Sequence, residues 1–598
     1  MTQDDATQHA TDWLQAFADA LRRGDIAAAA GRFAPDGHWR DLVAFTWNIA
    51  TFDGPAGIAA MLADTLAHTA PANWAIDGAA ERAEGVTQAW LTFETAAGRG
   101  RGHLRLRDGR CWTLLTALRE LKGFEERQGL TREEGVQHGA FKHRRTWQET
   151  RAAEAAALGA TTQPYVLVVG GGQGGIGLGA RLKRLGVPAL ILDRHPRPGD
   201  AWRRRYKSLC LHDPVWYDHM PYLPFPEHWP VYTPKDKLGD WLEMYTRVME
   251  LDYWGGTKVR HAAYDEAAGE WTVTALREGR EVTLRPQHLV LATGMSGVPN
   301  LPRYKGMERF AGLQHHSSRH PGGEGFAGKK CVVIGSNNSA HDICADLWEH
   351  DADVTMVQRS ATTVIRAATL RRLGMAGLYS EAALARGITT DIADLSVANI
   401  PYALAAQFQI PATEQIRRED AAFYERLAAA GFMLDFGEDG SGLSMKYLRR
   451  GSGYYIDVGA SELIMNGGIK LRSGVEVAEV TATGVLLNDG SELAADLIVY
   501  ATGYGSMNGW AAELISPEVA DRVGMCWGLG SGTARDPGPW EGELRNMWKP
   551  TRQPGLWFHG GNLAQSRHYS RYLALQLKAR MEGLATPVHA LAPVHHTG

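Results

Sequence analysis

One buried strand runs directly into a glycine-rich turn, and this junction constrains the chain more than any other part of its sequence. Residues 165–169 read YVLVV, and residues 170–175 read GGGQGG, which matches the pattern GxGxxG. A helical segment follows, and a second buried strand at 189–192 ends at Asp193. Strand, glycines, helix, strand and acid in this order predict a βαβ unit that binds a dinucleotide.

The glycines of this first turn have separate expected tasks. Gly170 permits the tight turn, Gly172 lets the backbone approach a pyrophosphate, and Gly175 lets helix and strand pack closely. Gln173 and Gly174 lie at the helix start, where free N–H groups and a partial positive charge favour phosphates. A glycine-rich turn with a purely structural role is the alternative interpretation.

The acid that follows the second strand is expected to bind a ribose. Asp193 can accept hydrogen bonds from both ribose hydroxyls, as acidic residues at this place in the motif do. We also assign Arg194 and Trp202, which follow it closely in the sequence, to the same cofactor.

A second strand–turn–helix begins near residue 330. Residues 330–334 read KCVVI, residues 335–340 read GSNNSA, and the next strand, 354–357, is followed by Arg359. A guanidinium at this position suits a 2′-phosphate and favours NADPH over NADH. A solvated charge at a strand end is the alternative interpretation of Arg359.

The residues of this second turn depart in part from the first. Gly335 opens the turn, but Asn337 replaces the middle glycine and still carries a Cβ. Asn338 and Ser339 stand at the helix start, where we expect them to cap the helix and to hold a pyrophosphate.

Two later strands end in the same letters, ATG. Their last residues are Thr293 and Gly294 in one strand and Thr502 and Gly503 in the other. In flavoproteins with two dinucleotide domains, such segments mark the crossings between the domains. The order of the motifs indicates one FAD half, an inserted NADPH domain and a returning FAD half.

The first part of the chain has a different pattern. Helical spacing comes first, with a turn at 34–37, and strand-like segments follow at 86–95, 101–107 and 111–119. Three helices followed by a curved antiparallel sheet form an α+β plan similar to the cone of ketosteroid isomerase. Residues 38–41 (HWRD) either line a cone pocket or begin a strand that packs a core Trp.

Composition excludes several classes of protein. The net charge is −4 and no segment of 18 apolar residues occurs, so we expect neither a nucleic-acid nor a membrane partner. Five scattered cysteines without a CxxC pair argue against a disulfide framework, a metal site and a dithiol reductase. The polar, acidic start lacks the features of a signal peptide, so we expect a cytoplasmic protein.

The motifs together resemble those of the class B flavin-dependent monooxygenases, which include the flavin-containing, YUCCA and Baeyer–Villiger monooxygenases. The family motif FxGxxxH is matched by Phe310, Gly312 and His316, and the segments 209–214 and 220–235 are most similar to YUCCA sequences. The cone-like extension resembles the type II flavin-containing monooxygenases.

This resemblance implies an NADPH- and O2-dependent enzyme, with NADH as a second donor, that works through a C4a-(hydro)peroxyflavin. We expect it to oxygenate small organic substrates, ketones by Baeyer–Villiger chemistry first and sulfides as a side activity. The alternatives are N- or S-oxygenation and an uncoupled NAD(P)H oxidase that releases H2O2. We also consider a homodimer through the cone domain.

The resemblance also assigns residues near the flavin. His212 stands where many relatives carry Asn, and we expect it to act in catalysis together with His316 and Asn338. A core histidine and a linker histidine are the alternatives for His212 and His316. Asn562 and Gln565, before an expected helix at 570–582, are assigned to the isoalloxazine, with a turn capped by Asn562 as the alternative.

The fold class that follows is an α/β flavoprotein with two dinucleotide-binding domains, preceded by an α+β cone domain. The expected boundaries are a cone at 1–122, a helical linker at 123–163, the first part of the FAD domain at 164–328, an NADPH domain with a helical insertion at 329–498, and the second part of the FAD domain at 499–598.

Overall fold

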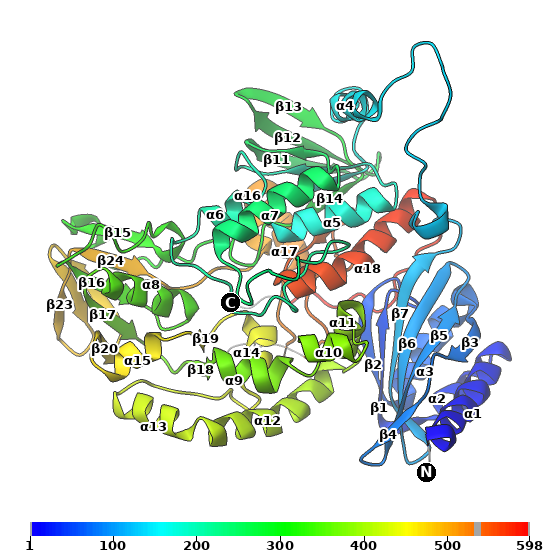
Figure 1. Ribbon diagram of the computed structural model, residues 1–598, viewed down its shortest axis with the longest axis horizontal. Coiled ribbons are helices and arrows are strands. Elements are labelled where there is room, and N and C mark those ends of the chain that lie inside the picture. The colour runs from blue at the N-terminus through cyan, green and yellow to red at the C-terminus, as the bar shows by residue number, and fades with distance from the viewer. Residues whose placement is uncertain (1–2, 531–539, 596–598) are drawn as a thin grey trace.

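The computed structural model describes residues 3–530 and 540–595 and has three main parts. A cone-like α+β domain lies at one end, a parallel sheet lies in the middle, and a second parallel sheet lies at the other end (Figure 1). Residues 1–2, 531–539 and 596–598 of the expected cone and FAD domains lie outside the described residues.

The N-terminal domain wraps one mixed sheet around three helices, in the order β2-β1-β7-β6-β5-β3 with β4 beside β5. Its elements are α1 (Gln3–Arg22), α2 (Ile26–Ala30), β1 (Phe33–Leu42), β2 (Ile49–Asp53), α3 (Gly54–Thr69), β3 (Ala72–Ile76), β4 (Glu81–Ala83), β5 (Val86–Glu94), β6 (Gly98–Arg107) and β7 (Arg110–Leu121).

Two details of the expected cone are wrong. Strands β1 and β2 precede the third helix, and β1 pairs with β7 in parallel, so the sheet is not purely antiparallel. The expected turn at 34–37 lies inside β1, where the register shifts between Phe33 and His38. A bulge of this kind absorbs extra residues while the strand continues, which the turn-forming letters did not reveal.

The inside of the cone is filled by aromatic side chains. Trp13 and Phe17 of α1 stack with ring centroids 5.0 Å apart, and Trp39 packs edge-on against Phe17. The indole N–H of Trp39 donates to the Thr116 hydroxyl at 2.8 Å. Of the two interpretations of residues 38–41, these contacts support the core Trp, because the Trp39 ring is fully buried among other aromatic side chains.

The segment that follows the cone is helical only in part. It holds one short 3-10 turn at Gly129–Thr131 and the helix α4 (Trp147–Ala157), which begins with a capping box between Thr146 and Glu149. Most of its residues are exposed, so they lack the packing contacts that stabilise helices in proteins. The alanine-rich and charged segment therefore forms one short α-helix and not a continuous helical linker.

The central sheet is parallel throughout, in the order β10-β9-β8-β14-β25, and helices α5 and α18 lie together beside it (Figure 1). Its elements and neighbours are β8 (Val166–Val169), α5 (Gln173–Arg184), β9 (Ala189–Leu192), α6 (Asp200–Arg203), α7 (Lys235–Val248), β10 (Tyr253–Trp254), β11 (Thr257–Asp265), β12 (Glu270–Arg277), β13 (Arg280–Leu284), β14 (His288–Leu291), α16 (Asn508–Leu514), α17 (Pro517–Val523), β25 (Leu556–Phe558) and α18 (Leu563–Met581).

The second sheet is also parallel, in the order β15-β24-β16-β17-β20. It begins before residue 328, the expected end of the first FAD part, because β15 pairs with β24. Its strands and helices are β15 (Leu313–His316), β16 (Lys330–Ile334), α8 (Asn338–Glu349), β17 (Asp353–Gln358), α15 (Ala460–Met465), β20 (Ile469–Ser473) and β24 (Leu497–Tyr500). A separate antiparallel sheet of β21 (Val477–Thr481), β22 (Gly484–Leu487) and β23 (Glu492–Ala494) lies between β20 and β24 in the sequence.

A mainly helical insertion between β17 and β20 runs along the lower edge of Figure 1 from the second sheet to the cone. It comprises β18 (Thr363–Arg366), α9 (Ala367–Thr369), a π-helical turn (Leu370–Met375), α10 (Glu381–Ala385), α11 (Thr390–Ala398), α12 (Tyr402–Glu419), α13 (Ala421–Ala429), α14 (Gly442–Arg450) and β19 (Tyr454–Asp457).

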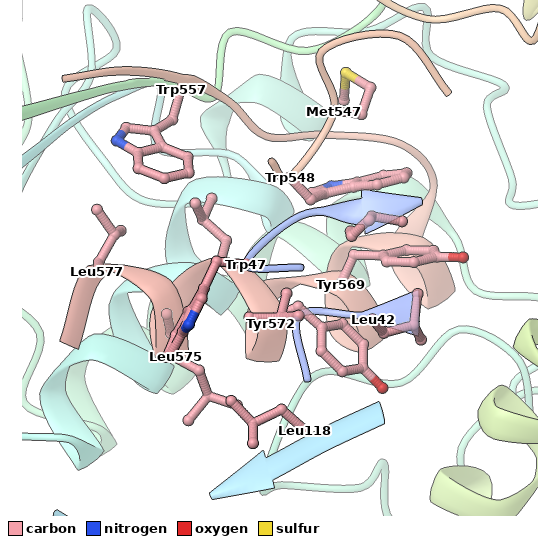
Figure 2. Packing of buried hydrophobic residues seen from close by; sticks show 14 of the residues in the cluster. Leu42, Trp47, Leu118, Met547, Trp548, Trp557, Tyr569, Tyr572, Leu575 and Leu577 are labelled. Atoms are coloured by element: carbon pink, nitrogen blue, oxygen red, sulfur yellow. The ribbon is translucent and has the colours of Figure 1, made fainter. Parts of the chain in front are cut away.

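The cone is joined to the flavoprotein part by one continuous apolar core. Leu42, Trp47 and Leu118 of the cone belong to the same buried cluster as residues of α18 and of the chain before β25 (Figure 2). Burial of such a surface is the main driving force for keeping two domains together. No helix of the described residues is long and apolar enough to cross a membrane.

A buried ion pair crosses this junction. The Arg40 guanidinium of β1 binds both carboxylate oxygens of Glu543, at 2.7 and 2.8 Å, and also donates to the Ala398 carbonyl at 2.7 Å. Both partners are almost fully buried, so removing one would leave the other charge buried without a partner and would destabilise the fold. Cone, insertion and C-terminal part are therefore held in one arrangement.

Candidate functional site

The first glycine turn has the geometry that close packing requires. Gly170 has φ +112°, and a Cβ there would lie 2.3 Å from the Ala292 carbonyl oxygen. A Cβ on Gly175 would lie 1.9 Å from the Gly170 carbonyl oxygen. By contrast, a Cβ on Gly172 would meet no protein atom within 4 Å. The packing tasks of Gly170 and Gly175 are thus met, and Gly172 faces open space that suits an approaching ligand.

Asp193 is held at the end of β9, next to this turn. Its side chain is buried, with 8% of the residue exposed, and its two oxygens accept the Gly171 and His195 backbone N–H groups, each at 2.7 Å. Each oxygen keeps a further lone pair, so the carboxylate can still accept a ligand hydroxyl. Arg194, the next residue, is exposed.

The start of α18 meets the start of α5. Gln173 donates to the Gly561 carbonyl at 3.4 Å and accepts the Trp202 indole N–H at 3.1 Å. Gly174 lies against the His559 ring, which a Cβ there would approach to 3.3 Å. The assigned Gln173, Gly174 and Trp202 are thus brought together with the distant segment 559–561 around two helix N-termini, where N–H groups favour an anion.

Asn562 and Gln565 form a capping box at the start of α18. The Asn562 side chain accepts the Gln565 N–H at 2.9 Å, and the Gln565 side chain accepts the Asn562 N–H at 3.3 Å. The helix begins at Leu563, seven residues earlier than the expected 570, because this cap satisfies its first N–H groups. The capping interpretation of Asn562 is confirmed, and contact with the isoalloxazine stays a prediction.

The second glycine turn repeats the first with different side chains. Gly335 has φ +130°, and a Cβ there would lie 2.3 Å from the Ala501 carbonyl oxygen. Asn337 has φ −99°, so the replacement of the middle glycine needs no left-handed backbone. Ser339 lies half-buried in the first turn of α8.

The expected capping role of Asn338 is wrong. Its side-chain oxygen accepts the Ile456 backbone N–H of β19 at 2.9 Å, and no side chain caps α8. The amide therefore fastens the helical insertion to the second glycine turn. Its assignments to catalysis and to the cofactor stay predictions.

Arg359 lies just beyond β17 with an open side chain. Its side chain is 72% exposed, and the Nε atom lies 3.9 Å from the Glu476 carboxylate. A contact of this length between exposed groups contributes little to stability. The guanidinium is therefore available for a phosphate.

The two ATG segments meet at the crossing between the sheets. Residues Pro299 and Tyr504, which follow these segments, form an antiparallel bridge, and the Thr502 hydroxyl donates to the Asn300 carbonyl at 2.6 Å. Thr293 and Gly294 follow β14 of the central sheet, and the Thr293 hydroxyl is buried without a partner among the described residues. The two assigned strand ends thus lie at one junction.

His316 fixes this crossing. Its Nε2 atom lies 3.0 Å from the Gly503 carbonyl oxygen, and its Nδ1 accepts the Ser318 N–H at 3.2 Å. Burial lowers the pKa of His316, in keeping with a neutral ring that donates through Nε2. These contacts support the linker interpretation, and a role in coupling NADPH binding to domain movement stays a prediction.

His212 lies where the two dinucleotide-binding parts meet. Its Nε2 is 3.5 Å from Oδ2 of Asp342 on α8, and the Tyr206 hydroxyl donates to the same oxygen at 2.6 Å. Burial is the largest single influence and lowers the pKa of His212, but the carboxylates of Asp342, Asp213 and Asp457 together raise the pKa above its ordinary value. The core-histidine interpretation is thus incomplete, because the ring has a carboxylate partner on α8, a helix of the second dinucleotide-binding part.

Three further residues at this junction were missed by the sequence analysis. The Tyr217 hydroxyl accepts from the Asn562 side-chain amide at 3.0 Å, and the Tyr447 hydroxyl donates to the Gln565 side chain at 2.7 Å. Burial raises the pKa of Asp213 to about 6. Asp213 is adjacent to His212 in the sequence and could have been predicted from that position. No motif near Tyr447 in the sequence indicates its contact with Gln565.

The polar atoms left without partners fit a bound dinucleotide. Among the described residues, the Thr293 hydroxyl and the ring nitrogens of the buried His559 have no partner within hydrogen-bond geometry, and Gly174 is the backbone group that acts on the His559 ring. Buried polar groups are normally paired, so their positions at the first glycine turn and the crossing suit a polar ligand. No group of metal-binding side chains occurs among the described residues.

Comparisons with known proteins agree with this geometry. Residues 167–373 match the family model for pyridine nucleotide-disulphide oxidoreductases, and residues 14–114 match that for SnoaL-like domains. The chain is 34% identical over 368 residues to indole-3-pyruvate monooxygenase YUCCA1 of Oryza sativa subsp. japonica. This alignment covers 61% of this chain and 83% of that protein. It is 34% identical to YUCCA6 of Arabidopsis thaliana over 33% of this chain and 48% of that protein.

Solved structures show the same fold. A cyclohexanone monooxygenase bound to epsilon-caprolactone matches with a TM-score of 0.50 at 20% identity, over 70% of this chain and 88% of that one. OTEMO in complex with FAD and NADP matches with a TM-score of 0.51 at 17% identity, over 71% and 85%. The expected flavoprotein fold with an N-terminal cone is thus confirmed.

Proposed function

This chain belongs to the flavin-dependent monooxygenase family of the indole-3-pyruvate monooxygenases, and on that premise we propose that it inserts one oxygen atom of O2 into small ketones. FAD and NADPH are its cofactors. Reduced FAD supplies the activated oxygen when it is bound, and the protein supplies position, charge and exclusion of water.

We assign the two nucleotides to the two glycine turns. The first turn would hold FAD, with its pyrophosphate on the N-terminus of α5 near Gly172 and its ribose on Asp193. The second would hold NADPH, with Arg359 on the 2′-phosphate. The burial of Asp193 and the exposure of Arg359 support this order, because FAD stays bound while NADPH exchanges.

The observation that carries the ketone assignment is the contact between His212 and Asp342. A histidine whose pKa is raised by a carboxylate holds its proton at higher pH and can stabilise negative charge next to it. An anionic oxygen nucleophile attacks a carbonyl carbon, whereas a protonated one transfers oxygen to sulfur or nitrogen. Indole-3-pyruvate, named for the curated relatives, is itself a ketone, which supports the same substrate class.

Residues around His212 would position the reacting groups. Tyr217 and Tyr447 fix the first turn of α18 through Asn562 and Gln565. Asp213, with its pKa raised by burial to about 6, can hold or release a proton near neutral pH. We expect this group of side chains to set the polarity of the substrate space.

A substrate panel tests the proposal. Purified yellow enzyme is given NADPH, O2 and matched ketones, sulfides and amines, and oxygenated product and H2O2 are both quantified. We expect esters or lactones from ketones and less sulfoxide. Products from sulfides and amines alone would replace the ketone assignment by S- or N-oxygenation, and H2O2 without product would indicate an oxidase.

Two further expectations stay predictions. We propose a cytoplasmic location, and we propose that any homodimer through the cone uses a surface other than the one packed on α18. That surface is already filled by the chain's own Trp47, Leu118 and Tyr572 (Figure 2).

A further inference from the structure

A cavity of about 620 Å³ lies where the cone, the central sheet's helices and the insertion meet. Its walls come from β7, the segment after it, α5, the loop 219–224, the start of α11 and α18. The volume is within the range of pockets for small organic molecules. Arg181, on one wall, is separated from Gln173 by about 12 Å of helix, so the cavity is distinct from the first glycine turn.

Two arginines in this cavity share one carboxylate oxygen. Arg119 of the cone and Arg571 of α18 both contact Oδ2 of Asp391, at 2.9 and 3.2 Å. Burial lowers the pKa of Arg571 to about 10, and the charges of Arg181 and Arg119 act in the same direction. One carboxylate thus serves two cations, with a third cation close by.

That third cation, Arg181, forms no ion pair with a carboxylate in the part of the chain that the structure describes. It is 4% exposed, and no carboxylate of the described residues lies within 4.0 Å of its guanidinium. Its Nε is buried without a hydrogen-bond acceptor, and the guanidinium lies over the Tyr222 ring at 4.6 Å. A buried guanidinium normally has an ionic partner, so this one is short of an anion.

The other charged groups of the cavity are already engaged. Arg567 binds both oxygens of Asp394, and Glu120 binds Arg99 at 2.7 Å. Glu126 accepts the Tyr222 hydroxyl, and Tyr222, Glu126 and Asp391 together raise the pKa of Arg181 despite its burial, although neither carboxylate forms an ion pair with its guanidinium. His219 is held neutral, because burial lowers its pKa to about 4. The cavity therefore retains an excess of positive charge.

The rest of the wall is largely apolar. Its apolar side chains are Leu185, Met220, Pro221, Pro224, Ala574 and Leu575. Such a surface gains free energy by covering carbon rather than water, at about 25 cal/mol per Å² of apolar area buried. An ion without carbon atoms would leave this surface uncovered.

We propose that this cavity is a binding site for a small organic monocarboxylate. The carboxylate accepts hydrogen bonds from Arg181 and from the Arg119–Arg571 pair, and its carbon chain covers the apolar wall. The site joins the cone to α18, so its occupation links the N-terminal domain to the helix that begins at Asn562. Binding here does not depend on the reaction proposed above.

Isothermal titration calorimetry of the FAD-loaded full chain with hexanoate tests the site, with hexanamide as the neutral control. We expect saturable hexanoate binding and at least tenfold weaker binding of the amide, because a charge-assisted pair contributes about 1.5–3 kcal/mol. No saturable heat from hexanoate up to about 10 mM would reject the proposal. Equal binding of inorganic phosphate would also reject it, because phosphate has no carbon to cover the apolar wall.

Three variants localise the binding. Arg181→Met keeps the side-chain length and removes an unpaired charge, so we expect a fold at least as stable and loss of hexanoate binding. Arg119→Gln should weaken hexanoate binding about tenfold. Arg107→Gln is the matched control, since Arg107 pairs with the exposed Asp36 of the same domain and lies outside the cavity. Unchanged hexanoate affinity in Arg181→Met and Arg119→Gln would overturn the assignment.

Discussion

The two glycine turns share a backbone plan but differ in how they hold charge. The first ends in Asp193, which is buried and held by two backbone N–H groups, while the second ends in Arg359, which is exposed and only loosely paired. The first is preorganised before any ligand arrives, and the second must order a flexible side chain on binding. The difference suits one nucleotide that stays and one that exchanges.

The largest effect expected from the first turn is on folding. Gly175→Ala would place a Cβ 1.9 Å from the Gly170 carbonyl oxygen, so strand and helix must separate. We expect a loss of about 3 kcal/mol or more in the free energy of unfolding, measured by denaturant titration, and a colourless protein. Gly172→Ala is the control, because its Cβ meets nothing within 4 Å; it should fold normally and lose FAD affinity. Equal stability of both variants would contradict the packing argument.

The next effect concerns the buried acid. Asp193→Ala removes the acceptor of two backbone N–H groups and of the expected ribose hydroxyls. Each hydrogen bond to a charged group contributes about 1.5–3 kcal/mol to stability or binding. We expect purified protein with little or no FAD by absorbance. A variant that retains full flavin would remove Asp193 from the site.

The exposed arginine should affect only the second nucleotide. Arg359→Ala should raise KM for NADPH about tenfold or more by loss of a charge-assisted pair, and leave KM for NADH, flavin content and Tm unchanged. Glu476→Gln is the matched control, since it removes the weak partner and keeps the cation. If both coenzymes respond equally, Arg359 has no role in reading the 2′-phosphate.

The smallest effect tests the contact between the two halves. The folded pKa of His212 is raised above its unfolded value, so its contribution to stability is present at low pH and is lost as pH rises through the folded pKa. Tm measured from about pH 6 to about pH 9 should therefore fall less in His212→Gln than in the parent. Parallel Tm curves would show that the His212–Asp342 pair adds nothing.

Local pattern was enough for much of this fold. The glycines at 170, 175 and 335 need positive φ or close approach, and each lies where a strand meets a helix in the structure. The strands of the cone at 86–94, 98–107 and 110–121 follow their alternation. The prediction of a turn at 34–37 was wrong, because bulges and turns contain the same residue types.

The candidate site was predictable only where its residues belong to a motif. Asp193 and Arg359 directly follow their strands, so the motif alone was enough to assign them, and their roles stay predictions. Tyr447 contacts Gln565 from a distant helix of the insertion, and no motif around it in the sequence indicates this contact. For Asn338 the motif led to a wrong prediction. Its position at a helix start predicted a helix cap, but its side-chain oxygen accepts a backbone N–H of β19 instead. Competition from a distant backbone cannot be seen in a window of sequence.

The amino-acid sequence by itself determined the two dinucleotide turns, their opposite charges and the family, because these depend on φ, residue spacing and residue type over short segments. Tertiary structure alone decided the contacts Arg40–Glu543 and His212–Asp342 and the cavity around Arg181. Each of these joins segments distant in the sequence, and each depends on which surfaces the domains bury against one another. Burial strengthens electrostatic interactions, so the domain junctions determine which buried charges form ion pairs and which are left for a ligand to bind.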